Sequence, residues 1–312
     1  MEKHYLRILT KNKNLYDSSL SITNNYLLFV DNKLKLFYMR VKKASGKTEE
    51  FKPEKIKRTC LRAGATLELA ENITKEIERR SYDGISTKEI LRMTVQLLGK
   101  DMPQVATRYD LKNSIFKLGP AGFTFEHFVS EILKEYGYST KMNRMIKGAG
   151  VKHEIDVIAS KDNENYMIEC KYHNLPGIYT GLKVTLYTYA RFLDLKDGWK
   201  RGVCQRFDQP WLVCNTKFSQ DAIQYANYKG LKLIGWRYPK KSGLEVFIEK
   251  KKLYPITILK TLDKDSQDKL ADAGLILAID LLRRDLEELN KITRIRVKKL
   301  RKFVEEVKKI CD

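Results

Sequence analysis

Apolar and polar positions alternate most regularly in the middle of the chain. In HEIDVIA, residues 153–159, the side chains of Ile155, Val157 and Ala159 are expected on one side of the backbone, which is the period-two pattern of a β-strand. The apolar segment YMIECKY, residues 166–172, predicts a second strand, and the polar residues between the two segments are typical of a turn. The pattern therefore predicts a β-hairpin.

Apolar residues spaced three and four apart predict amphipathic helices on both sides of this hairpin. The helix before it covers residues 123–138, with Gly137 near its end as a stop signal. The helix after it covers residues 179–199, where Lys183 and Arg191 can lie near a phosphate. In this second helix we expect three residues at helical spacing to face the core: Tyr187, Ala190 and Leu193. Further along, the pattern predicts a strand, a helix and a strand at residues 210–216, 218–230 and 231–236.

Residues 39–118 are predicted to form a short β-hairpin followed by helices. Pro53 suits the first turn of the first helix, and Ser86 can cap a later one. Between them, four apolar residues are expected near one helix face: Leu67, Ala70, Ile73 and Ile77.

Residues 1–38 are polar, rich in Asn and Lys, and without a sustained period. We expect a disordered arm or a misassigned start, with translation beginning at Met39. Mass spectrometry of the native N-terminus tests this, because any residue found before Met39 excludes it.

The C-terminal segment, residues 251–312, is predicted to be helical and very basic. Its first part resembles a helix-hairpin-helix motif, with one helix before Gly274 and a second helix after it. The last helix is predicted either to contact DNA, to dimerise or to dock on the preceding domain. Its apolar seam has heptad spacing and comprises Thr293, Val297, Leu300, Val304, Val307 and Cys311.

Composition points to a class of partner only through charge, because Lys and Arg outnumber Asp and Glu by 60 to 39, for a formal charge of +21. This excess favours a polyanion such as nucleic acid, although a generally basic proteome produces the same balance. The five cysteines are widely spaced without a CxxC pair, so we expect free thiols and no zinc ribbon. Without a long apolar run, the chain is expected to be soluble and cytoplasmic, with no membrane partner.

Candidate chemistry lies on the central hairpin. Glu169 and Lys171 are two residues apart and share a strand face, and pairing of the strands brings Asp156 toward them. Two carboxylates can bind a divalent cation through oxygen, with a lysine beside the water that the cation activates. The alternative is an ordinary exposed ion pair, since an acid two residues before a lysine is frequent in a chain with 32% charged residues. His153 and His173 flank the site and are expected to be hydrogen-bonded, non-catalytic residues.

A set of short motifs runs through residues 39–118. They are Val41-Lys42-Lys43 before Gly46, residues 51–56 (FKPEKI), Ala63-Gly64, Val105-Ala106 and Arg108-Tyr109. The set resembles the ATP-cone, the nucleotide-sensing module of many ribonucleotide reductases and of a family of bacterial transcriptional repressors. The resemblance implies that Lys42, Lys43 and Lys55 bind ATP or dATP as an effector. Lys43 replaces the usual arginine and lacks its bidentate geometry. The alternative is a basic hairpin exposed for solubility.

Residues 119–236 combine the opening helix, with its Phe125-Glu126 pair, with Asp156 and with Glu169-Cys170-Lys171 on successive strands. The later segment LVCNTKFSQDA places Asn215 and Thr216 at a sheet end. This order resembles the Mrr-like branch of the PD-(D/E)xK nuclease superfamily, which includes restriction endonucleases and archaeal junction resolvases. Ile155 stands where the superfamily has proline, a change that removes no ligand.

The resemblance implies phosphodiester hydrolysis in DNA. Asp156 and Glu169, with the Cys170 carbonyl, are the implied ligands of Mg²⁺ or Mn²⁺. Lys171 is implied to orient or deprotonate the attacking water, or to stabilise developing charge. Glu126 is implied as an outer member that either binds a second ion or positions Lys171.

The sequence thus predicts an α/β fold, a restriction-endonuclease-like mixed sheet flanked by helices, in a nuclease domain at 119–250. A mostly helical ATP-cone at 39–118 precedes it and the helical region 251–312 follows. The leading hypothesis is a metal-dependent DNA endonuclease regulated by nucleotide, through the assembly state of a homo-oligomer. One alternative is an ATP-responsive DNA-binding regulator with a non-catalytic nuclease fold, which the complete acid and lysine set disfavours. Another is RNA as the substrate.

Overall fold

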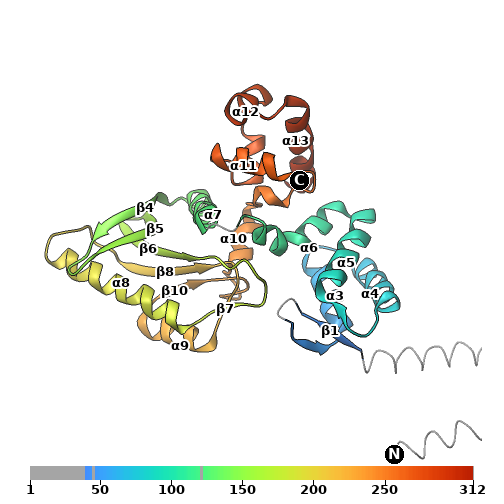
Figure 1. Cartoon of the computed structure of the whole chain (residues 1–312), viewed down its shortest axis with the longest axis horizontal. Coiled ribbons are helices and arrows are strands. Elements are labelled where there is room, and N and C mark those ends of the chain that lie inside the picture. Colours follow the sequence, from blue (N-terminus) through green and yellow to red (C-terminus); the bar gives the residue numbers. More distant parts are fainter. Residues whose placement is uncertain (1–38, 44–45, 120–121, 312) are drawn as a thin grey trace, which may run out of the picture.

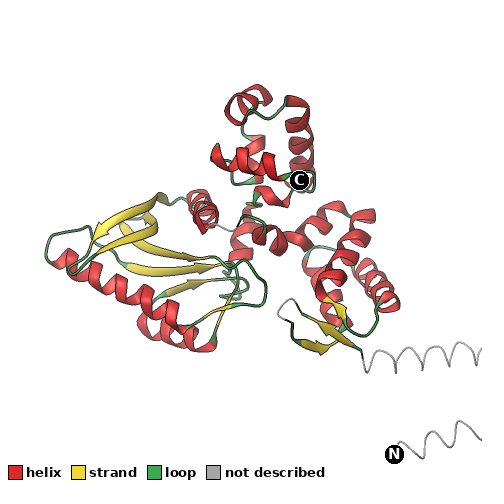
Figure 2. Ribbon diagram, viewed as in Figure 1, coloured by secondary structure: helices red, strands yellow, loops and turns green. Residues whose placement is uncertain are grey.

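The structure, a computed structural model, describes residues 39–43, 46–119 and 122–311 in three regions (Figures 1 and 2). The expected arm at 1–38 lies outside the described residues. In the first region, a small sheet packs against four helices, and the strand β3 joins the predicted hairpin in parallel with β1. The elements are β1 (Arg40–Lys42), β2 (Thr48–Glu50), α3 (Pro53–Arg62), α4 (Leu67–Arg80), β3 (Ile85–Ser86), α5 (Thr87–Asp101) and α6 (Pro103–Phe116).

The predicted starts of two helices in this region are confirmed. Pro53 occupies the first turn of α3, and the Ser86 hydroxyl accepts a hydrogen bond from the Glu89 amide at 3.1 Å. Leu67 departs from expectation, because its side chain is 57% exposed while Ala70, Ile73 and Ile77 are buried. Each three-residue step falls about 60° short of a full helical turn, which carries Leu67 away from the buried face.

The second region contains a five-stranded mixed sheet in the order β10-β8-β6-β5-β4. Strands β10, β8 and β6 are parallel, whereas β5 pairs antiparallel with both β6 and β4. Strand β4 was not predicted, because it is an edge strand with few buried residues and carries no apolar alternation. The strands are β4 (Ser139–Lys147), β5 (Lys152–Lys161), β6 (Glu164–Lys171), β8 (Gln209–Cys214) and β10 (Lys232–Ile234), with a separate pair β7 (Tyr179–Thr180) and β9 (Lys217–Phe218).

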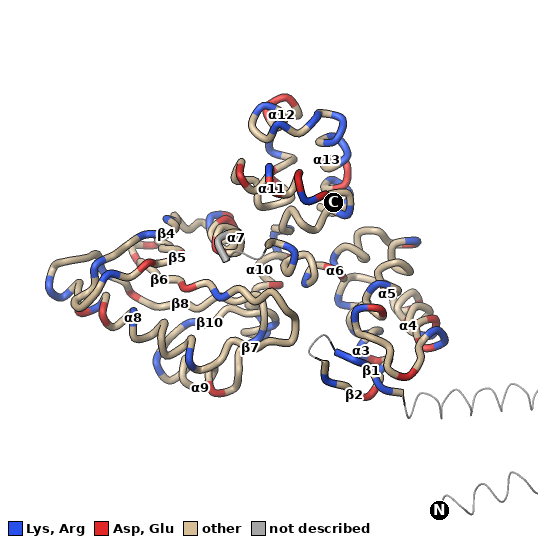
Figure 3. The backbone as a smooth tube through the Cα atoms, in the orientation of Figure 1, with Lys and Arg blue, Asp and Glu red and all other residues tan. Residues whose placement is uncertain are grey.

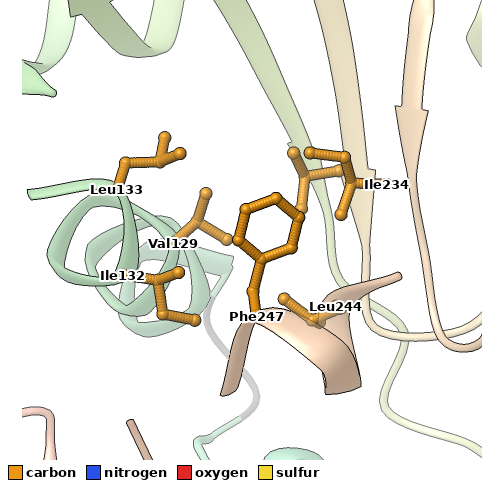
Figure 4. A pocket seen from close by; sticks show the side chains of 7 residues that line it. Val129, Ile132, Leu133, Ile234, Leu244 and Phe247 are labelled. Carbon is orange, nitrogen blue, oxygen red and sulfur yellow. The ribbon is translucent and has the colours of Figure 1, made fainter. Parts of the chain in front are cut away.

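Helices cover both faces of this sheet (Figure 1). They are α7 (Gly122–Glu135) and α10 (Leu244–Lys251) on one face, and α8 (Leu182–Lys200) and α9 (Gln220–Lys229) on the other. Figure 4 shows how tightly α7, the sheet and α10 meet, since the hollow lined by Val129, Ile234 and Phe247 measures only about 10 Å³. A space of this size barely holds one water, so it is a packing defect and not a ligand site.

Two expectations about side-chain direction were wrong. Ile155 packs on the α8 side of the sheet together with Ile158, and not with Val157 and Ala159 on the α7 side. On α8, Tyr187, Ala190 and Leu193 are exposed, and the inward face is formed by a different set. That set is Thr185, Thr188, Arg191, Phe192, Leu195 and Gly198.

The third region is made of short helices that share one continuous core with the sheet and α7. The helix expected after Gly274 is a five-residue 3-10 helix, buried at Ala278 and Leu281, and not the second α-helix of a helix-hairpin-helix. The elements are the 3-10 helices Ile256–Ile258 and Ala278–Leu282, with α11 (Lys264–Asp272), α12 (Leu286–Thr293) and α13 (Val297–Cys311). The last helix docks within the chain, one of the predicted alternatives, through Leu300, Phe303, Val307 and Ile310.

Helix α6 belongs to two cores at once. Val105 and Ala106, near its start, pack in the core of the first region, whereas Leu111 and Ile115, near its end, pack in the core shared by the sheet and the third region. Figure 1 shows α6 between these parts of the molecule. Among the helices described, none is long and apolar enough to cross a membrane.

Candidate active site

The predicted hairpin forms, and its strands separate at the residues of interest. The last paired residues of the β5–β6 ladder are Val157 and Ile168, so Asp156 and Glu169 occupy the next opposed positions. There the Cys170 amide donates to the Asp156 side chain at 2.7 Å instead of to a backbone carbonyl. The carboxylate of Asp156 is thus held by the backbone of the facing strand.

Glu169 is held from the other side of the site by α8. Its carboxylate forms an ion pair with the guanidinium of Arg191, and the two side chains are only 16% and 8% exposed. From the sequence, Arg191 is expected near a phosphate and not at the acids. Its position at the acids follows from the inward face of α8.

The carboxyl groups of Asp156 and Glu169 both have raised pKa values. Burial, followed by the charges of Glu169 and Glu126, raises the pKa of Asp156 to about 7, against the hydrogen bond from Cys170. Burial also raises the pKa of Glu169, although Arg191 and Lys171 act in the opposite direction. Three carboxylates, those of Glu126, Asp156 and Glu169, act here on one another against the two cations Arg191 and Lys171, and a bound divalent cation would stabilise the charged form of the acids.

Glu126 enters the site from α7. Its carboxylate accepts a hydrogen bond from the Asn143 amide group at 2.9 Å. Asn143 has a positive φ of 49° and lies on β4 opposite Asp156, between the pairs Met142–Val157 and Arg144–Ile155. Asn143 therefore links the third acid to the edge strand, and the sequence contained no signal for it.

Lys171 lies at the exposed end of β6, and the chain after it is fixed by Asn215. The Asn215 amide group accepts from the His173 backbone N–H and donates to the His173 carbonyl, both at 2.9 Å. These paired bonds hold the strand exit next to the lysine. Asn215 was placed correctly at a sheet end by the sequence.

Both flanking histidines have hydrogen-bond partners that account for them. His153 Nε2 lies 2.8 Å from Asp194, which also accepts from the Gly150 amide, and His173 Nε2 lies 2.9 Å from the Thr180 hydroxyl. Burial, followed by the charge of Lys171, lowers the pKa of His173.

The donor chemistry fits a hard divalent cation. Within residues 39–43, 46–119 and 122–311, no group of three or more His, Cys, Asp or Glu side chains converges as a ready metal site. The available donors are the oxygens of Asp156, Glu169 and Glu126, the ligand type that Mg²⁺ and Mn²⁺ prefer. Burial is the first cause of the raised pKa values of Asp156 and Glu169, and a divalent cation bound to these carboxylates would oppose it. The carbonyl of Cys170 stays a predicted ligand.

A second candidate site lies on the N-terminal hairpin. Glu49 pairs with Lys43 at 2.6 Å and with Lys55 at 2.9 Å, while Lys42 is exposed on β1. Lys55 and Glu49 line a hollow of about 170 Å³, together with Thr59. Two of the three predicted lysines therefore meet on one acid.

Comparison with known proteins divides the chain in the same order. Residues 39–111 match the ATP cone domain, residues 120–236 match the restriction endonuclease family Mrr_cat, and residues 254–311 match the family described as AF1548-like, C-terminal. An uncharacterized protein of Archaeoglobus fulgidus is 48% identical over 182 residues, which cover 58% of this chain and 99% of that protein. The chain belongs to the AF1548-like family.

A second uncharacterized protein of Archaeoglobus fulgidus is 51% identical to this AF1548-like chain over 41 residues, or 13% of the chain and 87% of that protein. The crystal structure of AF1548, described as a protein of unknown function, is 47% identical. It covers 61% of the chain and 98% of its own length, with a TM-score of 0.53. The restriction-endonuclease-like fold and the ATP-cone are thereby confirmed, and nuclease activity with nucleotide regulation is the function that these domains suggest.

Proposed function

We propose that this AF1548-like chain is a divalent-metal-dependent DNA endonuclease whose phosphodiester hydrolysis is regulated by ATP or dATP. The observation that carries the proposal is the separated end of β5 and β6. There, the partly buried Asp156 and Glu169 oppose each other, Glu126 lies close enough to raise the pKa of Asp156, and Lys171 ends the strand.

Asp156 and Glu169 would hold Mg²⁺ or Mn²⁺, which when bound supplies charge neutralisation at the scissile phosphate and lowers the pKa of water. The Cys170 amide fixes the orientation of Asp156. Lys171, which precedes the segment that Asn215 holds through its bonds to His173, would orient or deprotonate the attacking water. Glu126 would complete the acid set from α7.

A basic cluster next to the sheet supports nucleic acid as the substrate. The Trp236 amide donates to the Thr216 carbonyl at 2.7 Å, so Lys217 and Arg237 follow on adjacent segments, and the Lys112 ammonium lies 5.7 Å from the Trp236 ring centre. Burial, followed by the charges of Lys217 and Arg237, lowers the pKa of Lys112 to about 8. In the described part of the chain, no carboxylate forms an ion pair with these three cations, which leaves them available to phosphate.

Lys and Arg are distributed over all three regions in Figure 3, so a long polyanion can contact more than the sheet. We propose DNA because the fold is that of restriction endonucleases. Competition between matched DNA and RNA duplexes tests the choice.

Regulation is proposed to pass through α6, whose start packs in the ATP-cone and whose end packs beside the nuclease sheet. Tyr172, directly after Lys171, donates its hydroxyl hydrogen to the Phe116 carbonyl at 2.9 Å, at the end of α6. The Thr257 hydroxyl donates to the Ser114 carbonyl at 2.7 Å. A nucleotide-dependent shift of α6 would therefore reach the residue beside the catalytic lysine.

The test is cleavage of plasmid, branched and modified DNA with Mg²⁺ or Mn²⁺, with and without ATP or dATP. We expect metal-dependent strand scission whose rate changes with nucleotide. Size-exclusion chromatography under the same conditions shows whether the oligomeric state changes as well. Nucleotide-dependent DNA binding without scission, in any metal, would favour a non-catalytic regulator instead.

A further inference from the structure

Arg191 is the least expected group at the nuclease site, because it is an arginine on the inward face of a helix. Its side chain is 8% exposed and its guanidinium carbon lies 5.3 Å from the ring centre of Tyr187. Burying a guanidinium is costly unless its charge is paired. The ion pair with Glu169 provides that pairing.

The pairing of Arg191 is incomplete. One terminal nitrogen donates to Glu169, but the buried Nε has no hydrogen-bond partner among the described residues. An unpaired buried donor costs free energy, so the guanidinium does not reach its most favourable bonding arrangement in the metal-free chain. The Glu169 carboxylate is the acceptor that holds it.

Arg191 also acts on both acids electrostatically. It lowers the pKa of Glu169 more than Lys171 does, and it lowers that of Asp156. In the metal-free chain it therefore supplies the positive charge that a divalent cation would otherwise provide. A cation that binds Glu169 must compete with this guanidinium.

We propose that Arg191 is a positioning residue of the nuclease site: it holds the Glu169 carboxylate before metal binds and competes with the metal for it. The proposal rests on the proposed metal-dependent function. It differs from a purely structural role in the sign of one measurement, because loss of a structural ion pair would weaken metal binding, whereas loss of a competing cation strengthens it.

The experiment is calorimetric titration of the full chain with Mn²⁺ at pH 8. Arg191→Met is expected to bind Mn²⁺ at least about fivefold more tightly than the wild-type chain, because a like charge beside the metal has been removed. Arg191→Lys keeps the charge and is expected to stay within about twofold of wild type. The control is Arg206→Met, which removes an arginine paired with Asp208, away from the acids, and should leave Mn²⁺ affinity unchanged.

Equal or weaker Mn²⁺ binding by folded Arg191→Met would overturn the competing role of Arg191. Absence of Mn²⁺ binding by both the wild-type chain and Arg191→Met would instead overturn the metal-dependent function, and the inference with it. The two failures are thus distinguishable.

A measurement on the wild-type chain covers the case in which Arg191→Met does not fold. In an arginine-¹⁵N-labelled sample, the Nε–H signal missing from Arg191→Lys identifies Arg191. Addition of Mg²⁺ is expected to shift this signal, because Glu169 changes partner. An unchanged Arg191 signal at a Mg²⁺ concentration that shifts neighbouring resonances would show that the guanidinium does not compete for Glu169.

Discussion

The ATP-cone hairpin and the end of the nuclease sheet both join acids to cations, but with opposite charge balance. On the hairpin one acid, Glu49, meets two lysines near the surface, and Lys43, followed by Lys55, lowers its pKa. At the sheet end, burial raises the pKa values of the partly buried carboxylates of Asp156 and Glu169. The hairpin therefore joins two lysines to one acid, whereas the sheet end joins Asp156, Glu169 and Glu126 to the two cations Arg191 and Lys171. The first suits a triphosphate and the second a metal ion.

The two regions also differ in how firmly the groups are held. The hairpin strands are three residues long, and Lys42 and Lys43 are exposed, so these lysines can move to a ligand. At the sheet end, long paired strands, α7 and α8 surround the acids, and the backbone of Cys170 orients Asp156. An effector site tolerates mobile groups, whereas hydrolysis depends on fixed ones.

The largest expected effect is at the sheet end. Asp156→Ala and Lys171→Ala should each lower metal-dependent cleavage by about 10²- to 10⁴-fold, the range for loss of a group acting in the chemical step. Supercoiled plasmid nicking under single-turnover conditions measures this. Asp197→Asn, on the exposed side of α8, is the control and should cleave normally. Wild-type rates in both Asp156→Ala and Lys171→Ala would refute the active-site assignment.

Beside the hairpin, on α3, Lys55→Ala should weaken ATP binding by about tenfold, or roughly 1.4 kcal/mol, through loss of one charge-assisted contact. Isothermal titration calorimetry measures this. Lys57→Ala is a matched control, since Lys57 lies on the same helix but pairs with Glu71 at 2.8 Å and should affect ATP little.

In the same titration, Glu49→Gln tests whether ATP affinity changes in the opposite direction. It removes the acid that pairs with Lys43 and Lys55, so ATP affinity should rise. If Lys55→Ala and Lys57→Ala weaken binding equally, the hairpin is only a basic surface.

A smaller effect is expected at the end of α6, where Tyr172 of the sheet region contacts Phe116. Tyr172→Phe removes the hydrogen bond to the Phe116 carbonyl while keeping the ring. The ratio of cleavage rates with and without ATP should move toward one, by about two- to fivefold, because a neutral hydrogen bond contributes roughly 0.5–1.5 kcal/mol. Tyr228→Phe, an exposed tyrosine on α9, is the control. An unchanged ratio would exclude this route through α6.

The smallest effect concerns the basic cluster. Because the pKa of Lys112 is lowered to about 8, its ammonium loses its charge as pH rises through that value, and DNA affinity should fall over the same range. Fluorescence anisotropy without metal should show this step in the wild-type chain and not in Lys112→Met. At pH 7, Lys112→Met should reduce the salt dependence of log K by about one unit of slope. The control is Lys75→Met, on the exposed side of α4, which should behave as wild type. If the pH step persists in Lys112→Met, a group other than Lys112 causes the loss of DNA affinity.

Prediction from sequence succeeded where the pattern was local. The helix containing Phe125 and Phe128 and the strands of Asp156 and Glu169 have strong three-to-four or period-two spacing, and they form as expected. Strand β4 has little apolar alternation because it lies at the sheet edge. The segment after Gly274 is apolar enough for a buried helix but forms only a 3-10 turn inside the shared core.

The sequence by itself determined which candidate catalytic groups this protein carries, because the residue types of Asp156, Glu169 and Lys171 and their strand spacing are local properties. Only the tertiary structure decided which groups surround them. The inward face of α8, and with it the contact of Arg191 with Glu169, depends on which residues the sheet can bury. Likewise, α6 packs in two cores because segments that are distant in the sequence contact its two ends. The spacing of apolar residues within α6 does not reveal these contacts.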